Sequence, residues 1–199
     1  MSKQIIDIKD VIKYFDDKAN IWDQNTINND KVINTILDNA KISSEKKVLD
    51  VACGTGVLFP YYLERNVKEV IAIDISKNMT RIAESKCDNH IIKVINDDIN
   101  NYETDIKYDC IVVYNAFPHF IDQEALISKL SKLLKKDGYL TIANSISRDN
   151  LNKLHNNIMN ISYPLMPINE LALMCSKYLK IEKMISNDEM YQIVGKLID

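Results

Sequence analysis

Residues 48–56 have the sequence VLDVACGTG, in which a short apolar run leads directly into a glycine-containing loop. The chain has only four glycines, and two of them, Gly54 and Gly56, stand in this loop. In open α/β sheets, ligands bind beyond the carboxyl ends of the strands, where glycines let the backbone approach a ligand and the next helix offers free N–H groups. The stretch therefore predicts a buried strand followed by a ligand-binding loop. A tight turn without a ligand is the alternative.

Strand-like runs of mostly apolar residues alternate with amphipathic helical patterns along the chain. Such runs suit strands that are buried on both faces of a parallel sheet. The expected strands are Lys47–Val51, Val70–Asp74, Ile91–Ile95, Cys110–Tyr114 and Tyr139–Ala143, and the expected helices are Leu58–Arg65, Ser76–Lys86 and Asp122–Leu134. Two later runs, Ile181–Ser186 and Met190–Lys196, leave no room for a helix between them and predict an antiparallel hairpin at one sheet edge. The sequence therefore predicts an α/β fold with a doubly wound, Rossmann-like, mostly parallel sheet of seven strands.

Size and composition indicate a single globular domain, residues 1–199. Residues 1–40 look helical and precede the first strand, so we expect them to form a cap or lid. The formal net charge is −3, and no Lys/Arg run carries interleaved aromatics, which argues against a nucleic-acid partner. The chain has no apolar signal core and no membrane-length apolar run, and its four cysteines lack metal-ligand spacing. We therefore expect a cytoplasmic monomer or homodimer without a metal or a membrane partner.

Acidic residues near the glycine loop distinguish between two types of cofactor. A dinucleotide site needs a third glycine at the position that Phe59 occupies here. Asp50, four residues before Gly54, would repel a pyrophosphate but would favour a cationic amine or sulfonium. Asp74 ends the second expected strand, twenty residues beyond Gly54, where a carboxylate accepts hydrogen bonds from the two ribose hydroxyls. The loop therefore favours a cationic, ribose-containing cofactor over a nicotinamide dinucleotide.

Two further residues are candidates for contact with an adenine ring. Asp98 follows the third expected strand, where its carboxylate could accept from an exocyclic amine. Met79, in the helix after Asp74, could lie against the ring. Acids at strand ends are also common helix caps, and a methionine at a helical position is as often part of the core. Both alternatives stay open at this point.

The order of these motifs resembles that of the class I S-adenosylmethionine-dependent methyltransferases. The pattern D-x-x-x-G-x-G is followed by Asp74, Asp98, YDCIVV at 108–113 and LKKDGYL at 134–140. The resemblance covers roughly residues 10–197 and is strongest to the small-molecule branch that includes the ubiquinone and menaquinone methyltransferases. Two departures are mild: Ala52 stands where a glycine is common, and Lys136-Asp137 where Pro-Gly is common.

The resemblance implies a set of cofactor contacts for S-adenosylmethionine and its product S-adenosylhomocysteine. Asp50 and Gly54 would hold the methionine end, Asp74 the ribose, and Asp98 with the Ile99 backbone the adenine. Residues 14–23 resemble the family's N-terminal lid, whose aromatics close over the cofactor. The full expected set is Tyr14, Trp22, Asp50, Ala52, Gly54, Gly56, Asp74, Ile75, Met79, Asp98, Ile99 and Asn115.

Candidates for the methyl acceptor site follow the fourth and fifth strands. Histidine ordinarily titrates near neutrality, so His119, in the segment YNAFPHF at 114–120, could act as a general base for a hydroxyl or thiol acceptor, with His155 as second candidate. Arg148, Asn152 and His155 fall on one helical face and, with Phe117, could line an acceptor pocket that residues 146–178 cover. A histidine that caps a helix and a solvated helix face are the alternatives.

The composition of these segments argues against two special acceptors. Enzymes that methylate exocyclic amines of bases resemble one another in an Asn/Asp-Pro-Pro-aromatic run, whereas residues 115–118 read NAFP. Metalloid methylation needs converging thiolates, and the four cysteines are scattered. We therefore expect methyl transfer to a small-molecule acceptor. The rival hypothesis is a cofactor-binding module without its own chemistry, serving as a partner subunit or sensor.

Overall fold

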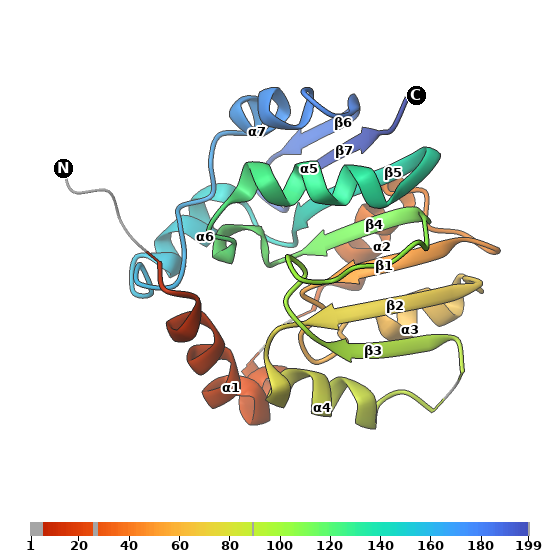
Figure 1. Ribbon diagram of the computed structural model, residues 1–199. Coiled ribbons are helices and arrows are strands. Elements are labelled where there is room, and N and C mark those ends of the chain that lie inside the picture. The colour runs from red at the N-terminus through yellow and green to blue at the C-terminus, as the bar shows by residue number, and fades with distance from the viewer. Residues whose placement is uncertain (1–5, 26–27, 89, 199) are drawn as a thin grey trace.

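The computed structural model describes residues 6–25, 28–88 and 90–198. Its centre is a seven-stranded sheet in the order β3-β2-β1-β4-β5-β7-β6 (Figure 1). The strands are β1 (Lys47–Val51), β2 (Glu69–Asp74), β3 (Ile92–Asn96), β4 (Tyr108–Tyr114), β5 (Leu134–Asn144), β6 (Lys180–Ser186) and β7 (Tyr191–Lys196). The first five strands pair in parallel, whereas β7 runs antiparallel to both β5 and β6. The predicted fold class is confirmed, including the C-terminal hairpin at one sheet edge.

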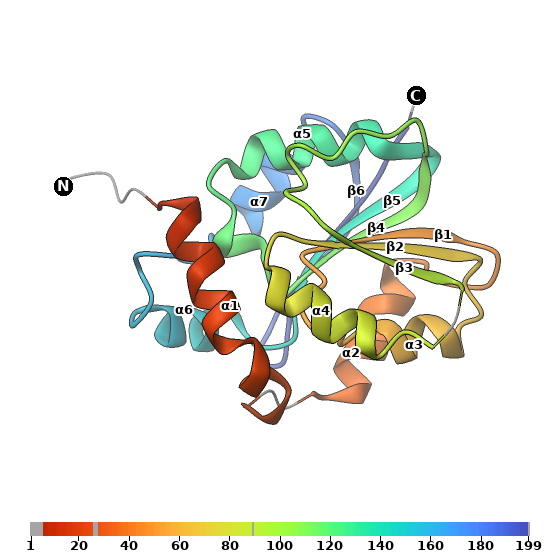
Figure 2. The ribbon, with the colours of Figure 1, turned by 60° about the horizontal axis from the view of Figure 1, so that its bottom comes forward.

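Helices cover both faces of the sheet (Figures 1 and 2). They are α1 (Ile8–Asn25), α2 (Asp30–Asn39), α3 (Phe59–Glu64), α4 (Lys77–Ser85), the short 3-10 helix η1 (Phe117–His119), α5 (Gln123–Leu133), α6 (Arg148–His155) and α7 (Ile168–Cys175). Figure 2 shows α5 and α7 on one side of the sheet and α2, α3 and α4 on the other. None of the helices in the described part of the chain combines the length and apolar character needed to cross a bilayer.

Two cores result from the alternation of side chains along each strand. Leu49 and Val51 of β1 belong to a cluster with the helices α5 and α7. Val48, which precedes Leu49 and points to the opposite face, belongs to the cluster beneath α2 and α3. Strands buried on both faces explain why the parallel strands could be recognised as short apolar runs in the sequence.

The expected strand and helix boundaries agree with the structure to within about two residues, except at β5. This strand begins at Leu134, five residues before the expected Tyr139, and follows α5 without a connecting loop. Leu134 is buried and pairs with Tyr108 at a register irregularity of β4. The sequence did not predict this extension, because residues 135–137 are polar and do not continue the apolar run of the strand. The predicted helix caps are present: Ser76 accepts from the Met79 N–H and Asp122 from the Ala125 N–H.

Candidate functional site

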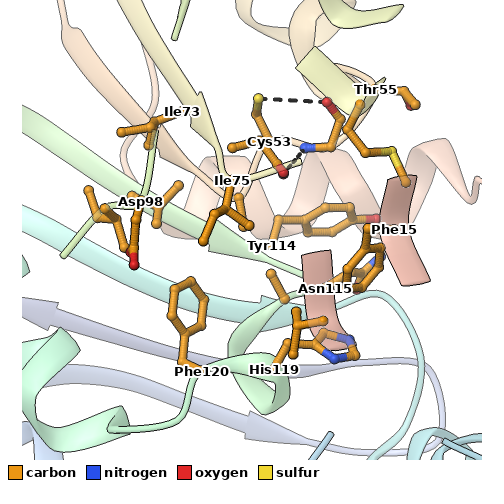
Figure 3. Close-up of a pocket in the computed structure, with 18 of the residues that line it drawn as sticks. Phe15, Cys53, Thr55, Ile73, Ile75, Asp98, Tyr114, Asn115, His119 and Phe120 are labelled. Carbon is orange, nitrogen blue, oxygen red and sulfur yellow. Dashed lines mark hydrogen bonds between the residues drawn. The ribbon is translucent and has the colours of Figure 1, made fainter. Parts of the chain in front are cut away.

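A cavity of about 340 Å³ opens at the carboxyl ends of the parallel strands. Its wall comes from the glycine loop after β1, the end of β2, residues 97–100 after β3, residues 114–121 after β4, and the inner side of α1 (Figure 3). The sequence-predicted residues in this wall are Trp22, Ala52, Gly54, Asp74, Ile75, Met79, Asp98, Ile99, Asn115 and His119. Residues from five separate segments therefore converge on the edge of the sheet where the sequence placed a ligand site.

The two glycines of the loop have different roles. Gly54 has a φ of +56°, and a Cβ placed on it would meet no atom within 4 Å. Its backbone therefore faces open space in the cavity, where a ligand can approach it closely. Gly56 has a φ of +81°, and its Cβ would meet the ring of Phe59 at 2.5 Å, so this glycine serves helix packing and lies outside the cavity wall. Ala52 also has a left-handed φ of +56°, at the position where the family resemblance led us to expect glycine.

Asp74 connects the end of β2 to the glycine loop. One of its oxygens accepts from the Gly54 N–H and the other from the Ser76 N–H, both at 2.8 Å. The residue is 8% exposed and lines the cavity. Burial raises the pKa of Asp74 to about 6, although both hydrogen bonds act in the opposite direction. The carboxylate is thus positioned at the cavity wall by two backbone amides.

Asp50 lies behind the cavity wall and not in it. Its side chain is 2% exposed, and alternation along β1 places it on the face beneath α3, beside Tyr62. Burial raises the pKa of Asp50 to about 7, outweighing the Tyr62 hydroxyl, and the charge of Asp74 adds to the rise. A cation entering the cavity would offset this burial, because it favours the ionised carboxylates.

The far end of the cavity has the composition expected of an adenine site. Ile75, Met79 and Ile99 supply apolar surface there, and Met79 is only 1% exposed. Asp98 Oδ1 accepts from both the backbone and the side-chain amide of Asn100, at 2.9 Å and 3.0 Å. The carboxylate therefore caps a turn, as in the alternative interpretation, while it also lines the cavity.

Aromatic rings from α1 form the opposite end of the cavity. Phe15 packs edge-on against Trp22, with ring centroids 5.5 Å apart, and against His119 at 5.0 Å. Tyr14 packs edge-on against Phe15 and, like Phe15, against a cluster that includes Val11 and Ile161, but Tyr14 itself does not line the cavity. Sequence reasoning singled out Tyr14 and missed Phe15. The seven-residue spacing of Phe15 and Trp22, which puts both on one helical face, was the available signal.

His119 has a defined tautomer. Its Nδ1 lies 2.9 Å from the carbonyl oxygen of Ile161, and because a carbonyl only accepts, Nδ1 carries the proton and Nε2 keeps its lone pair. Burial lowers the pKa of His119 to about 4, with a smaller contribution from the nearby His155. The imidazole is therefore neutral at physiological pH.

The polar face of α6, formed by Arg148, Asn152 and His155, is hydrogen-bonded to a neighbouring segment. Arg148 Nε donates to the Leu165 carbonyl at 2.9 Å, and Asn152 bonds both the N–H and the carbonyl of Leu165, at 2.7 Å and 3.1 Å. His155 Nδ1 lies 2.6 Å from Ser162 Oγ, and its pKa is lowered by burial. These three side chains share one helical face, as predicted, but lie outside the cavity wall.

Residues 161–165, to which the polar face of α6 is hydrogen-bonded, also contact the cavity wall. Its Ile161 carbonyl bonds His119, and the Tyr163 N–H donates to the Pro118 carbonyl at 2.9 Å. Phe117 is fully buried in the core under α5 and does not reach the cavity. Of the expected acceptor-site residues, the structure therefore brings His119 alone to the cavity. Helix α7 packs on β6 and β7, so a cover role for residues 146–178 stays a prediction.

Two aspartates attach α1 to α4 and to the glycine loop, and sequence reasoning did not identify either of them. Asp16 Oδ1 accepts from Ser76 Oγ at 2.6 Å and from the Asn78 N–H at 3.0 Å, at the start of α4. Asp23 accepts from Thr55 Oγ1 at 2.6 Å and pairs with Lys86 at 2.6 Å. Helix α1 therefore contacts both the start of α4 and the glycine loop.

The described residues show no arrangement of side chains suited to thiol or metal chemistry. All four cysteines are free, and only Cys53 lies in the cavity wall. No cluster of three His, Cys, Asp or Glu side chains suited to a metal ion occurs among residues 6–25, 28–88 and 90–198.

Comparison with known proteins agrees with this geometry. Residues 48–138 match a family described as a methyltransferase domain. A malonyl-[acyl-carrier protein] O-methyltransferase of Acetivibrio thermocellus is 31% identical over 142 residues, which are 70% of this chain and 50% of the relative. The chain spans about half the length of the curated relatives that it matches.

Solved methyltransferase structures share the fold at low sequence identity. The methyltransferase bound to the Trm112 activator of Haloferax volcanii superposes with a TM-score of 0.79 at 14% identity, covering 93% of this chain and 98% of that one. The N-methyltransferase NodS of Bradyrhizobium japonicum WM9, in complex with S-adenosyl-L-homocysteine, gives 0.69 at 13% identity and covers 85% and 87%. The chain has the Rossmann-like fold of the S-adenosylmethionine-dependent methyltransferases. The finer resemblance to quinone methyltransferases stays a prediction.

Proposed function

We propose that this protein transfers the methyl group of S-adenosylmethionine to a small-molecule acceptor. The observation that carries the proposal is the cavity, in which the open backbone of Gly54 and the carboxylate of Asp74 lie at one side and His119 with Phe15 at the other. The match of residues 48–138 to the methyltransferase domain family supports it. Location in the cytoplasm and a monomer or homodimer are part of the same proposal.

The residues of the cavity fit this cofactor. Gly54 leaves space for a close approach that any Cβ would fill, and Asp74 offers oxygens at the ribose position. Met79 and Ile99 offer apolar surface for a base, with Asp98 beside them. No Lys or Arg side chain lies in the described part of the wall, which suits a cationic sulfonium and disfavours a pyrophosphate.

The chemistry needs little beyond orientation. S-adenosylmethionine supplies an electrophilic methyl group and a neutral thioether leaving group. The protein holds the acceptor in line and close to contact, which contributes several kcal/mol to catalysis in well-oriented reactions, on the order of 7–11 kcal/mol at most. His119 Nε2 is the candidate base for a hydroxyl or thiol acceptor, and His155, which is 5.3 Å from His119 between ring centroids, lies behind it.

The first experiment is thermal unfolding with S-adenosylmethionine, S-adenosylhomocysteine or NAD added separately. A ligand at a hundred times its dissociation constant stabilises the fold by about 2.7 kcal/mol. Both sulfur ligands are expected to raise the melting temperature, and NAD is not. Stabilisation by NAD alone would contradict the assignment of the loop after β1.

A turnover measurement distinguishes a methyltransferase from a cofactor-binding module without its own chemistry. We expect S-adenosylhomocysteine to form with a suitable acceptor, and Asp74→Ala and Gly54→Leu to abolish its formation. Full activity in both variants would contradict the proposed function. Tight cofactor binding without methyl transfer to any acceptor in a broad extract would favour the module.

A further inference from the structure

All charged side chains in the described part of the cavity wall are negatively charged. Asp23, Asp74, Asp97 and Asp98 line it, and the lining within the described residues includes neither lysine nor arginine. Asp74, Asp97 and Asp98 belong to the β2–β3 side, where the cofactor is placed, whereas Asp23 belongs to α1 and pairs with Lys86. An anionic acceptor in the same cavity would be desolvated near these like charges, with no lysine or arginine in the described wall to offset them, which is unfavourable.

The remaining wall, where an acceptor would lie, is aromatic and aliphatic. Tyr114 ends β4, Phe120 comes from the segment that follows, and Phe15 approaches from α1 (Figure 3). Ile121, next to Phe120, also lines the wall. His119 is the one titratable side chain between them apart from the Tyr114 phenol, and its Nδ1–H is already bonded to the Ile161 carbonyl. This surface suits a compact apolar molecule, and aromatic faces attract a cation more strongly than a neutral group.

We propose, resting on the function proposed above, that the acceptor is the uncharged amine of a compact apolar molecule. The amine nitrogen uses its lone pair to form a bond to the methyl carbon, while the carbon–sulfur bond of the sulfonium breaks and its electron pair stays on sulfur. The positive charge passes from sulfur to nitrogen and never leaves the acidic, aromatic cavity. The substrate ammonium gives up its proton to water before the free amine binds, and the methylated product leaves the cavity as an ammonium that keeps its proton near neutral pH.

A hydroxyl acceptor would use the same cavity less well. Its proton must leave as the methyl arrives, and the only imidazole in the wall would become a buried cation between Phe15 and the Ile161 carbonyl. Burial lowers the pKa of His119 to about 4, far below the operating pH at which a general base is most effective. An amine needs no base before attack, because the neutral form already carries the lone pair.

Three probes with one shared aromatic body test the proposal: 2-phenylethylamine, 2-phenylethanol and 3-phenylpropanoate. Binding is measured by calorimetry with S-adenosylhomocysteine present, and methyl transfer by product mass with S-adenosylmethionine. We expect the amine to bind at least tenfold more tightly than the acid and to be the methylated probe. Its kcat/KM should rise about tenfold per unit between pH 7 and 9, because aliphatic amines titrate at about 10.4.

Substitution of a residue at the mouth of the cavity provides an independent test of the proposal. Ile121 lines the wall and is 47% exposed, so a longer polar side chain is accommodated there. Ile121→Arg is expected to improve binding of 3-phenylpropanoate at least tenfold and to weaken the amine, whereas the matched Ile121→Gln leaves their ratio near the wild-type value. Equal or tighter binding of the acid by the wild type, or faster methylation of the alcohol, would overturn the amine proposal. Loss of stabilisation by both sulfur ligands would instead overturn the proposed function.

Discussion

Gly54 combines a left-handed backbone with an open side-chain direction, and these two properties can be separated by substitution. Gly54→Ala strains the backbone by about 1–2 kcal/mol, while Gly54→Asn strains it less because asparagine tolerates this region. Both add a side chain where the cofactor backbone contact is expected. We therefore expect both variants to weaken S-adenosylhomocysteine binding at least tenfold, about 1.4 kcal/mol, although their stabilities differ.

Calorimetry and urea unfolding on the same samples measure the two effects. Unchanged affinity in Gly54→Asn would mean that the cofactor does not approach this part of the loop. Gly56→Ala is the control for a packing role, since its Cβ would collide with Phe59 outside the cavity. It should lower stability more than it lowers affinity.

The buried carboxyl of Asp50 should make the free energy of unfolding fall as the pH rises, which is opposite to the effect of a carboxylate whose pKa is lowered on folding. Its pKa in the folded protein, about 7, is above the ordinary value of 3.8 because the side chain is buried, with Asp74 adding to the rise and the Tyr62 hydroxyl opposing it. The stability that protonated Asp50 contributes is complete below pH 3.8 and is lost as the pH rises through 7. Relative to Asp50→Asn, the wild type should lose up to about 4 kcal/mol over this window.

Urea unfolding of both proteins between pH 4 and 8 tests this expectation. A difference in unfolding free energy that stays constant with pH would show that Asp50 is not a buried titrating group. Asp109→Asn is a useful comparison, because Lys135 holds that carboxylate at 2.8 Å and its pKa is lowered. The stabilisation that Asp109 contributes should stay constant between pH 4 and 8 and be lost only when the pH falls below 3.8.

Residue-level properties were only partly available from the sequence. The spacing of Asp50, Gly54 and Asp74 predicted that the last two would meet at the cavity, since both end adjacent parallel strands. The burial of Asp50 behind the wall depends on the register of β1, where Val48 and Asp50 share a face. Phe15 was overlooked because its partner His119 lies about a hundred residues away in the chain.

Helix α1 is attached through Asp16 to the first turn of α4, and this attachment can be removed without disturbing the helix. Asp16→Ala deletes the acceptor for Ser76 Oγ and the Asn78 N–H, whereas alanine favours the helix itself. Hydrogen bonds to a charged group contribute about 1.5–3 kcal/mol. We expect amide exchange in residues 8–25 to accelerate at least tenfold and cofactor release to become faster.

Asp17→Ala is the matched control on the same helix. Asp17 pairs with exposed Lys13 at 2.7 Å, a contact of small energetic value. Equal exchange rates in the two variants would mean that α1 is held by its apolar face alone. The exchange is measured by mass spectrometry, with and without S-adenosylhomocysteine.

Helix α6 positions His119 indirectly, through the segment 161–165. Asn152→Ala removes both hydrogen bonds to Leu165, so the Ile161 carbonyl should lose its fixed position near His119. Water then reaches the imidazole, and its pKa should rise from about 4 toward 6.5. Lys153→Ala, at the exposed neighbouring position, should leave it unchanged.

Nuclear magnetic resonance titration of the histidine ring signals measures this pKa directly. A value near 4 in Asn152→Ala would show that the segment needs no support from α6. The sequence predicted the shared face of Arg148, Asn152 and His155 from helical spacing. It could not predict their partners, because residues 156–167 lack the periodicity that identifies a strand or a helix.

The whole molecule consists of two hydrophobic cores separated by one sheet, and this arrangement makes a prediction about additivity. Ile127 of α5 and Ile36 of α2 are fully buried in different clusters on opposite faces. Each Ile→Val substitution removes one methylene and should cost about 0.5–1.5 kcal/mol. Because the pair shares no contact, the double variant should show the sum of the single effects to within about 0.5 kcal/mol.

Ile33 and Ile36 provide the comparison, since they lie three residues apart on α2 and in the same cluster. Their double variant is free to deviate from additivity, because one side chain can fill space that the other leaves. Guanidinium unfolding of the single and double variants measures both pairs. A large coupling between Ile36 and Ile127 would mean that strain crosses the sheet. The edge that carries the cavity would then respond to packing on both faces, and substitutions far from it would alter cofactor affinity.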